Sequence, residues 1–319
     1  MVMAQSLFIT LKQLHPQSQI DVLAPSWTFA LLERMPQVRQ GIAMSLTHGQ
    51  FGFNARRQLG LELRKQQYQQ AIVLPNSWKS TLTPFFAGIP KRSGYVGELR
   101  WGLLNDSRRL DKILLPMTVQ RFVALAYPKQ ATVPPVCPSP KLLVNQQAQA
   151  DTAAKFNIDR GTPIAVLCPG AEYGPAKRWP AAHFAALASA LRQQNMQVWL
   201  FGSNKDKDVA SEIQLLSGNA CQDFTGLTTL AEAIDLMALS QVVISNDSGL
   251  MHIAAALDKK LIALYGSSDP GFTPPLQQQA QILSLNLPCA PCFKRVCPLG
   301  HTHCLSELMP ERVLAALFD

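Results

Sequence analysis

The stretch from residue 242 to residue 266, VVISNDSGLMHIAAALDKKLIALYG, contains the pattern that decides the fold. Residues 242–245 and 261–265 are short apolar runs of the length of buried strands, and a short helix is expected to begin at Gly249. A strand, a helix and a second strand in succession are typical of a parallel βαβ unit. This segment therefore predicts an α/β protein with a parallel sheet.

The same alternation extends through the chain on both sides of this segment. Helices are expected at the start of the chain, where Leu7, Leu11 and Leu14 share one face, and behind Thr229, which forms a capping box with Glu232. The other expected helices span residues 27–35, 56–67, 79–87 and 180–194. The other expected strands span residues 20–24, 71–76, 164–167 and 198–201.

Length and composition indicate two domains. A chain of 319 residues, 47% of them hydrophobic, can bury more than one core of ordinary size. The helical and strand periodicity fades between Tyr127 and Asn157, in a stretch rich in Pro, Gln and Ala. We expect a first Rossmann-like domain with its linker over residues 1–157 and a second over residues 158–319.

The charge balance favours an anionic partner. The formal net charge is +8 and the pI is near 9.2. Because no arginine-rich helix and no interleaving of aromatic and basic residues occurs, nucleic acid is the partner that this sequence favours least. No apolar run approaches the roughly 18 residues of a spanning helix, and no signal-peptide pattern opens the chain, so a soluble cytoplasmic protein is expected.

Ligands of open parallel sheets bind beyond the carboxyl ends of the strands, where three turns of the second domain are unusual. After strand 242–245 come Asp247, Ser248 and Gly249, with His252 one turn later. Backbone N–H groups at such a helix N-terminus suit a phosphate, and glycine allows a close approach. The other interpretation of this turn is an ordinary helix cap.

The other two turns add a cation and a carboxylate. The loop CPGAEYGPAKRWP, residues 168–180, contains Lys177, which can neutralise a pyrophosphate or be a solvated surface lysine. The turn FGSNKDKD, residues 201–208, offers Asp206 or Asp208 to the hydroxyls of a ribose, although surface charge explains either one alone. Because the three turns belong to one sheet, they together predict a nucleotide-diphosphate site.

Four long segments carry a family resemblance. They are residues 168–180, SNDSGLMHIAAAL at 245–257, LYGSSDPGFTPP at 264–275, and LPNSWKSTLTPFFAGIPKRSGYVGELRWGLLND at 74–106. Over the whole chain the sequence resembles the heptosyltransferases of lipopolysaccharide core synthesis, in glycosyltransferase family 9. The resemblance implies a GT-B fold and inverting transfer of L-glycero-D-manno-heptose from ADP-heptose to the first heptose of the inner core. It therefore also implies a heptosyl-Kdo2-lipid A acceptor at the cytoplasmic face of the inner membrane.

The resemblance also implies roles for individual residues. Asp247, Ser248, Gly249 and His252 would hold the diphosphate, Lys177 would stabilise the leaving group, and Lys177 and Asp247 are the candidate catalytic residues. No cofactor is implied, because Lys177 and a helix N-terminus would supply the preorganised electrostatics. Lys79, Arg92 and Arg100 lie in the segment expected to bind the acceptor, with ordinary solvated cations as the alternative.

The catalytic base is expected in the family's first βα loop, on an aspartate. The sequence begins at a point that matches the middle of the family's first helix, so the resemblance places this base on no residue of the chain. We expect a version extended upstream to be active and the 319-residue chain to be inactive and poorly soluble. An inactive nucleotide-sugar-binding remnant is therefore one alternative function. Heptosyltransferase I, acting on Kdo, and a nucleotide-sugar epimerase of the same fold are the others.

Seven cysteines fall into two groups. Cys137, Cys168 and Cys221 stand singly and are expected to be structural. The other four have the spacing C-x2-C-x4-C-x6-C, with two histidines between the last two, and are Cys289, Cys292, Cys297 and Cys304. They indicate either a structural zinc site, placed far from the transfer chemistry, or reduced free thiols.

Overall fold

A computed structural model describes residues 1–44, 46, 50–98, 100–129 and 133–317. The chain falls into two compact units. Unit 1 comprises residues 1–2, 33–36 and 139–319, and unit 2 comprises residues 3–32 and 37–138. Residues 139–157, which the sequence analysis placed with the first domain, lie in unit 1, because the helix they contain packs on α9 (Leu230–Met237) of that unit.

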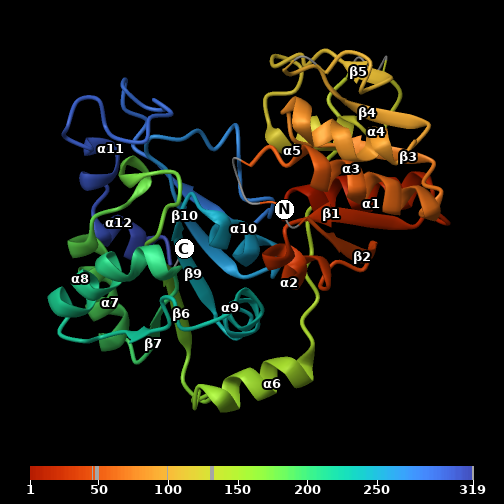
Figure 1. The fold of residues 1–319 in the computed structure, drawn as a ribbon. Helices are drawn as coiled ribbons and strands as arrows, with labels where there is room; N and C mark the ends of the chain where they lie inside the picture. Colours follow the sequence, from red (N-terminus) through yellow and green to blue (C-terminus); the bar gives the residue numbers. More distant parts are fainter. Residues whose placement is uncertain (45, 47–49, 99, 130–132, 318–319) are drawn as a thin grey trace. The chain divides into compact units, whose positions relative to one another are not determined.

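Unit 1 is built on a six-stranded sheet, in which all strand pairs are parallel and the order is β11-β10-β9-β6-β7-β8 (Figure 1). The strands are β6 (Ile164–Cys168), β7 (Gln197–Leu200), β8 (Gln222–Asp223), β9 (Val242–Asn246), β10 (Lys260–Leu264) and β11 (Gln281–Leu283). Strands β6 and β9 are buried throughout, which fits the apolar runs of residues 164–168 and 242–244.

Helices cover both faces of this sheet. They are α6 (Gln146–Lys155), α7 (Ala181–Gln193), α8 (Lys207–Leu216), α9 (Leu230–Met237), α10 (Gly249–Ala256), α11 (His303–Ser306) and α12 (Pro310–Ala315). One core cluster joins Phe184 and Leu187 of α7, Ile213 of α8 and Val313 of α12 to alternate residues of the central strands. Helix α10 packs on β9 and β10. The predicted α/β class with a parallel sheet is confirmed.

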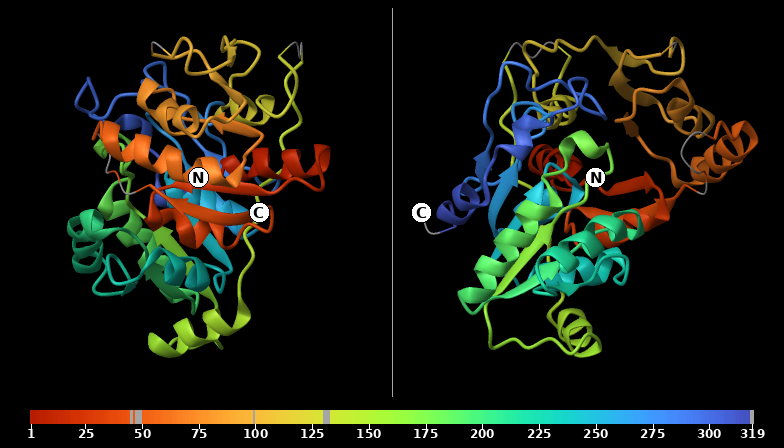
Figure 2. Two further views of the ribbon diagram at one scale, coloured as in Figure 1. Left: turned by 45° about the vertical axis from the view of Figure 1, so that its right-hand side comes forward. Right: turned by 90° about the vertical axis from the view of Figure 1, so that its left-hand side faces the viewer.

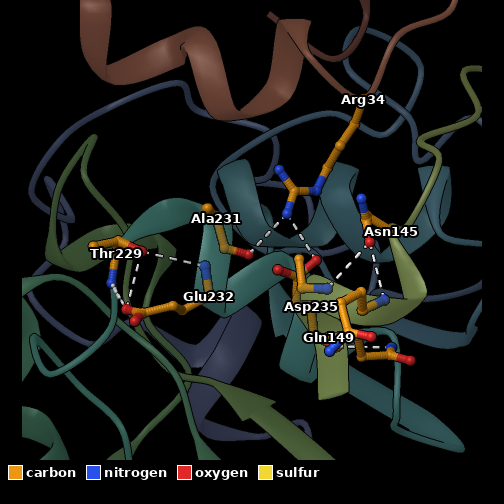
Figure 3. A network of polar contacts seen from close by, with 9 residues as sticks. Arg34, Asn145, Gln149, Thr229, Ala231, Glu232 and Asp235 are labelled. Carbon is orange, nitrogen blue, oxygen red and sulfur yellow. Dashed lines mark hydrogen bonds and ion pairs between the residues drawn. The ribbon is translucent and has the colours of Figure 1, made fainter. Parts of the chain in front are cut away.

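A polar network fastens residues 33–36 and helix α6 to helix α9 within unit 1 (Figure 3). Arg34 Nη2 donates to Asp235 Oδ1 at 2.7 Å, and both side chains are nearly buried. Gln149 Nε2 donates to the backbone oxygen of Asp235 at 3.0 Å. Thr229 and Glu232 form the capping box of α9 that the sequence predicted. The network explains why residues 33–36 belong to this unit.

Unit 2 contains two separate parallel sheets, ordered β1-β2 and β3-β4-β5 (Figure 2). Its strands are β1 (Ile20–Ala24), β2 (Val38–Ala43), β3 (Gln70–Val73), β4 (Lys91–Tyr95) and β5 (Asp106–Arg108). Its helices are α1 (Ala4–Leu14), α2 (Phe29–Leu32), α3 (Phe53–Leu63), α4 (Leu82–Phe86) and α5 (Thr118–Ala124). The Tyr68 hydroxyl, just before β3, donates to Asp21 of β1 and so links the two sheets.

The sequence located the central strands of unit 1 and helices such as α1, α3, α7 and α9, but it missed other elements, among them helix α8 and strand β2. Strands β2, β4 and β5 were not expected, because each of them has polar or glycine residues where a buried strand would have apolar ones. Helix α1 forms as predicted with Leu7 buried, but Leu14 at its end is 42% exposed. Within the described part of the chain, no helix has both the length and the apolar character needed to span a membrane.

Candidate functional site

The carboxyl ends of β6 and β9 are joined by one buried amide. Asn246, the last residue of β9, has no exposed surface. Its Nδ2 donates to the Pro169 backbone oxygen at 2.8 Å, and its Oδ1 accepts from the Trp179 N–H at 3.1 Å. Asn246 therefore holds the loop between Pro169 and Trp179 against the turn after β9. The sequence analysis gave Asn246 no role, although its position directly before Asp247 could have indicated that it belongs to the same turn.

The next residues begin helix α10. Ser248 is the N-cap, and its hydroxyl accepts from the Met251 N–H at 3.4 Å. The N–H groups of the first helical residues have no carbonyl partner inside the helix. A Cβ atom added to Gly249 would meet no atom within 4 Å, so open space lies in front of this helix end. Ser248 and Gly249 therefore begin a helix with free N–H groups, and anion binding there stays a prediction.

Lys177 is brought to the same place from the β6 loop. It ends a short 3-10 helix, Pro175–Lys177, and its Nζ contacts Asp247 Oδ2 at 2.5 Å. The Lys177 side chain is 17% exposed and that of Asp247 is 6% exposed, so solvent screens this pair weakly. The ammonium group also lies 5.2 Å from the centre of the Tyr173 ring. Two residues 70 positions apart thus form one charged pair beside α10.

His252 lies one turn into α10. Burial lowers its pKa to about 4, while the nearby Asp247 carboxylate acts to raise it and Lys177 and the amino group of Met1 act to lower it. The imidazole is therefore neutral at pH 7 and can donate one N–H to an anion without carrying a charge.

The Asp206 carboxylate is hydrogen-bonded within its own turn, to Ser203. It is 9% exposed, and its Oδ2 accepts from both the backbone N–H and the hydroxyl of Ser203, at 2.9 and 2.8 Å. Its Oδ1 lies 3.6 Å from Arg178 Nη2. The carboxylate packs against Gly170, where an added Cβ would come within 2.6 Å of it. Asp206 thus shapes the turn after β7, and contact with a ribose stays a prediction.

The three cations predicted for the acceptor have different surroundings within unit 2. Arg100 is 3% exposed and donates to the Pro75 and Tyr95 backbone oxygens. Arg92 donates to the Leu103 and Ile89 backbone oxygens. These contacts give both arginines a structural role. Lys79 is only partly buried, and its Nζ reaches a single backbone oxygen at 3.3 Å.

The four C-terminal cysteines line one small pocket, together with Ala176 and Ser267. Ala176 precedes Lys177, and Ser267 follows the end of β10. These cysteines therefore lie beside the turn that carries Lys177, because the chain after β11 returns to the carboxyl edge of the sheet. Among the described residues no group of three or more His, Cys, Asp or Glu side chains has the geometry of a metal-binding set.

A helix N-terminus, a charged pair and a neutral histidine thus lie together at the carboxyl edge of a parallel sheet, which is where open α/β sheets bind their ligands. Residues 56–303 match the family model described as glycosyltransferase family 9 (heptosyltransferase). The chain belongs to this family and is a glycosyltransferase.

Two heptosyltransferases are similar to this chain over nearly its whole length. The chain is 45% identical to lipopolysaccharide heptosyltransferase 2 of Salmonella typhimurium and 45% identical to lipooligosaccharide heptosyltransferase 2 of Haemophilus ducreyi. Each alignment covers 99% of this chain and 94% of the relative.

Among solved structures, the chain matches Escherichia coli ADP-heptose heptosyltransferase II with a TM-score of 0.89 and 43% identity, over all of this chain and 94% of that one. It matches an E. coli heptosyltransferase solved with ADP with a TM-score of 0.72 and 18% identity, over 99% of this chain and 95% of that one. The second likeness concerns the fold alone. These matches confirm the expected GT-B fold class.

Proposed function

We propose that the protein transfers L-glycero-D-manno-heptose from ADP-heptose to the first heptose of the lipopolysaccharide inner core, with inversion at the anomeric carbon. The observation that carries this proposal is the open helix N-terminus at Gly249 beside the Lys177–Asp247 pair. The relatives that align over nearly their whole length are named as heptosyltransferases of lipopolysaccharide and lipooligosaccharide, which supports a heptose as the transferred sugar.

The donor diphosphate would lie in front of α10. Lys177 has three N–H donors and uses one on Asp247, so it can also donate to a phosphate oxygen. The N–H groups at the start of α10 meet the same charge, with the positive end of the helix dipole behind them. Neutral His252 would add one more donor. We propose these groups as the donor-binding set.

Transfer with inversion is a single displacement. The acceptor hydroxyl oxygen forms a bond to the anomeric carbon, and the bond from that carbon to the phosphate oxygen breaks, which releases ADP. Negative charge grows on the diphosphate, so Lys177 and the helix N-terminus stabilise the transition state more than the ground state. Asp247 acts by holding the Lys177 ammonium in place. No metal ion is needed for this stabilisation.

The proton of the attacking hydroxyl must go to a base. Asp247 is paired with Lys177, and Asp206 accepts two hydrogen bonds from Ser203. Neither carboxylate is therefore proposed as the base.

The acceptor would be heptosyl-Kdo2-lipid A at the cytoplasmic face of the inner membrane. A formal net charge of +8 favours a peripheral location on an anionic surface. Of the three predicted acceptor cations, we propose Lys79 as the one that contacts the acceptor, because its ammonium group is the least engaged within the protein.

The test has a binding step and a transfer step. Calorimetry should show that ADP binds and that UDP binds more weakly, and equal affinity for the two nucleotides would contradict the proposal. ADP release should then require both ADP-heptose and heptosyl-Kdo2-lipid A. Preference for Kdo2-lipid A would instead indicate the first heptose transfer, and conversion of the donor without an acceptor would indicate an epimerase.

A further inference from the structure

The segment 289–304, called the cysteine segment below, forms most of the lining of a small pocket in unit 1. Four thiol groups face this pocket from both ends of the segment: Cys289, Cys292, Cys297 and Cys304. The proposed donor site uses none of them. Their convergence is a tertiary feature, since up to 15 positions separate them in the chain.

Backbone contacts fasten the cysteine segment to the two turns beside the donor site. The Ala176 N–H donates to the Arg295 oxygen at 3.1 Å, directly next to Lys177. The Phe293 N–H donates to the Ser267 oxygen at 2.8 Å, in the turn after β10. The Tyr173 hydroxyl, whose ring lies beside the Lys177 ammonium, donates to the Phe293 oxygen at 2.8 Å.

Two glycines allow the backbone beside the donor site to approach the cysteine segment closely. A Cβ atom added to Gly174 would come within 2.5 Å of the Arg295 backbone oxygen, and one added to Gly266 would come within 2.9 Å of Cys304 Sγ. Neither approach leaves room for a side chain. The position of the Lys177 turn therefore depends directly on the position of the cysteine segment.

The backbone of residues 299–302 turns around the sulfur of Cys297. The N–H groups of residues 299–302 donate to its sulfur. To do so the chain takes positive φ angles at Gly300 (74°) and at Thr302 (51°), the second of which is unfavourable for a non-glycine residue. These contacts hold the Cys297 sulfur in place at the pocket.

Cys304 lines the same pocket from the other end of the cysteine segment. Four cysteines that include a C-x2-C pair are a ligand set typical of structural metal sites. Sulfur-only ligand sets with tetrahedral geometry select zinc or iron. The four side chains surround the pocket without forming a coordination set, and they range from exposed (Cys289) to partly buried.

We propose that Cys289, Cys292, Cys297 and Cys304 bind one zinc or iron ion per chain, which draws the four sulfurs together and fixes the turn that carries Lys177. The ion stays outside the transfer reaction and acts on the donor site through the contacts at Arg295 and Phe293. The binding of an ion by the four cysteines is argued from the cysteine segment alone. The effect of this ion on Lys177 rests on the proposed donor site.

Elemental analysis of the full chain, purified under reducing conditions from cells given zinc and iron, tests the first part. About one equivalent of zinc or iron per chain is expected, and the optical spectrum distinguishes the two, since iron–thiolate centres are coloured. Cys292→Ser should lose most of the metal, with affinity lower by about tenfold or more. Cys137→Ser, which changes a cysteine outside the segment, should keep it.

Metal-free protein with four freely reactive thiols, or with a disulfide inside the segment, would overturn the proposal. So would full metal retention in Cys292→Ser. If this variant fails to fold, removal of the metal from the unchanged protein with a chelator, followed by its return, supplies the same comparison.

ADP calorimetry on the loaded and the chelated protein tests the second part. Loss of the metal should weaken ADP binding by about threefold to tenfold, the cost of ordering one or two side chains on binding. Unchanged affinity would refute the link to the donor site. If neither form binds ADP, the proposed function fails and the metal result stands by itself.

Discussion

Replacement of Lys177 by alanine is the sharpest test of the donor site. The change removes an ammonium group that contacts Asp247 at 2.5 Å and lies beside the start of α10. Two losses follow for a bound diphosphate. The charge-assisted contact disappears, and the Asp247 carboxylate, 6% exposed, becomes an uncompensated negative charge next to the ligand.

The magnitude follows from these two effects. A hydrogen bond to a charged group contributes about 1.5 to 3 kcal/mol, which corresponds to a roughly 10- to 150-fold increase in the Kd for ADP. Because Asp247 is left unpaired, we expect a result near the upper end of this range. A second change, Lys177→Ala with Asp247→Asn, should recover part of the loss, since it removes the repulsion but does not restore the contact.

Titration calorimetry with ADP measures the effect, and a denaturation curve for each variant shows that the protein is folded. Lys205→Ala is the matched control. Lys205 follows the neighbouring strand and pairs with Glu172, but both side chains are more than 70% exposed. An exposed pair contributes little, so ADP affinity should change by less than about twofold. A loss below about 0.5 kcal/mol in Lys177→Ala would show that Lys177 does not contact the diphosphate.

Three further changes test the site and the fold. Gly249→Ala should fold normally, because open space surrounds the position of its Cβ atom. The variant should bind ADP about tenfold or more weakly if the diphosphate approaches the helix end. Unchanged affinity would place the ligand elsewhere. Burial lowers the pKa of His252 from its ordinary value of about 6.5 to about 4. Between these two pH values the unfolded state binds more protons than the folded state. The free energy of unfolding should therefore fall by about 1 to 3 kcal/mol as the pH drops from 6.5 to 4. His252→Gln should flatten this part of the stability profile, and an unaltered profile would count against the depressed pKa. Arg34→Met leaves the Asp235 carboxylate buried without its partner and should cost about 3 kcal/mol or more in urea unfolding, whereas a cost below about 1 kcal/mol would make the pair dispensable.

The sequence alone predicted the α/β class and most of the proposed donor site. Apolar runs such as residues 242–245 and 261–265 predict buried strands because a strand covered on both faces has no polar side. The turn from Asp247 to Gly249 predicts an anion site because its chemistry is local, being the free N–H groups at the start of a helix. These features need no knowledge of distant contacts.

The tertiary structure decided which distant residues meet and how they use their polar groups. Composition could not show that Lys177 pairs with Asp247 rather than with water, or that Arg100 is buried on backbone oxygens. The position of the cysteine segment beside Ala176 was equally out of reach, because the return of the chain to the carboxyl edge of the sheet is encoded in packing and not in local periodicity. Local patterns specify single elements, whereas charge pairing and burial depend on groups that the fold brings together from far along the chain.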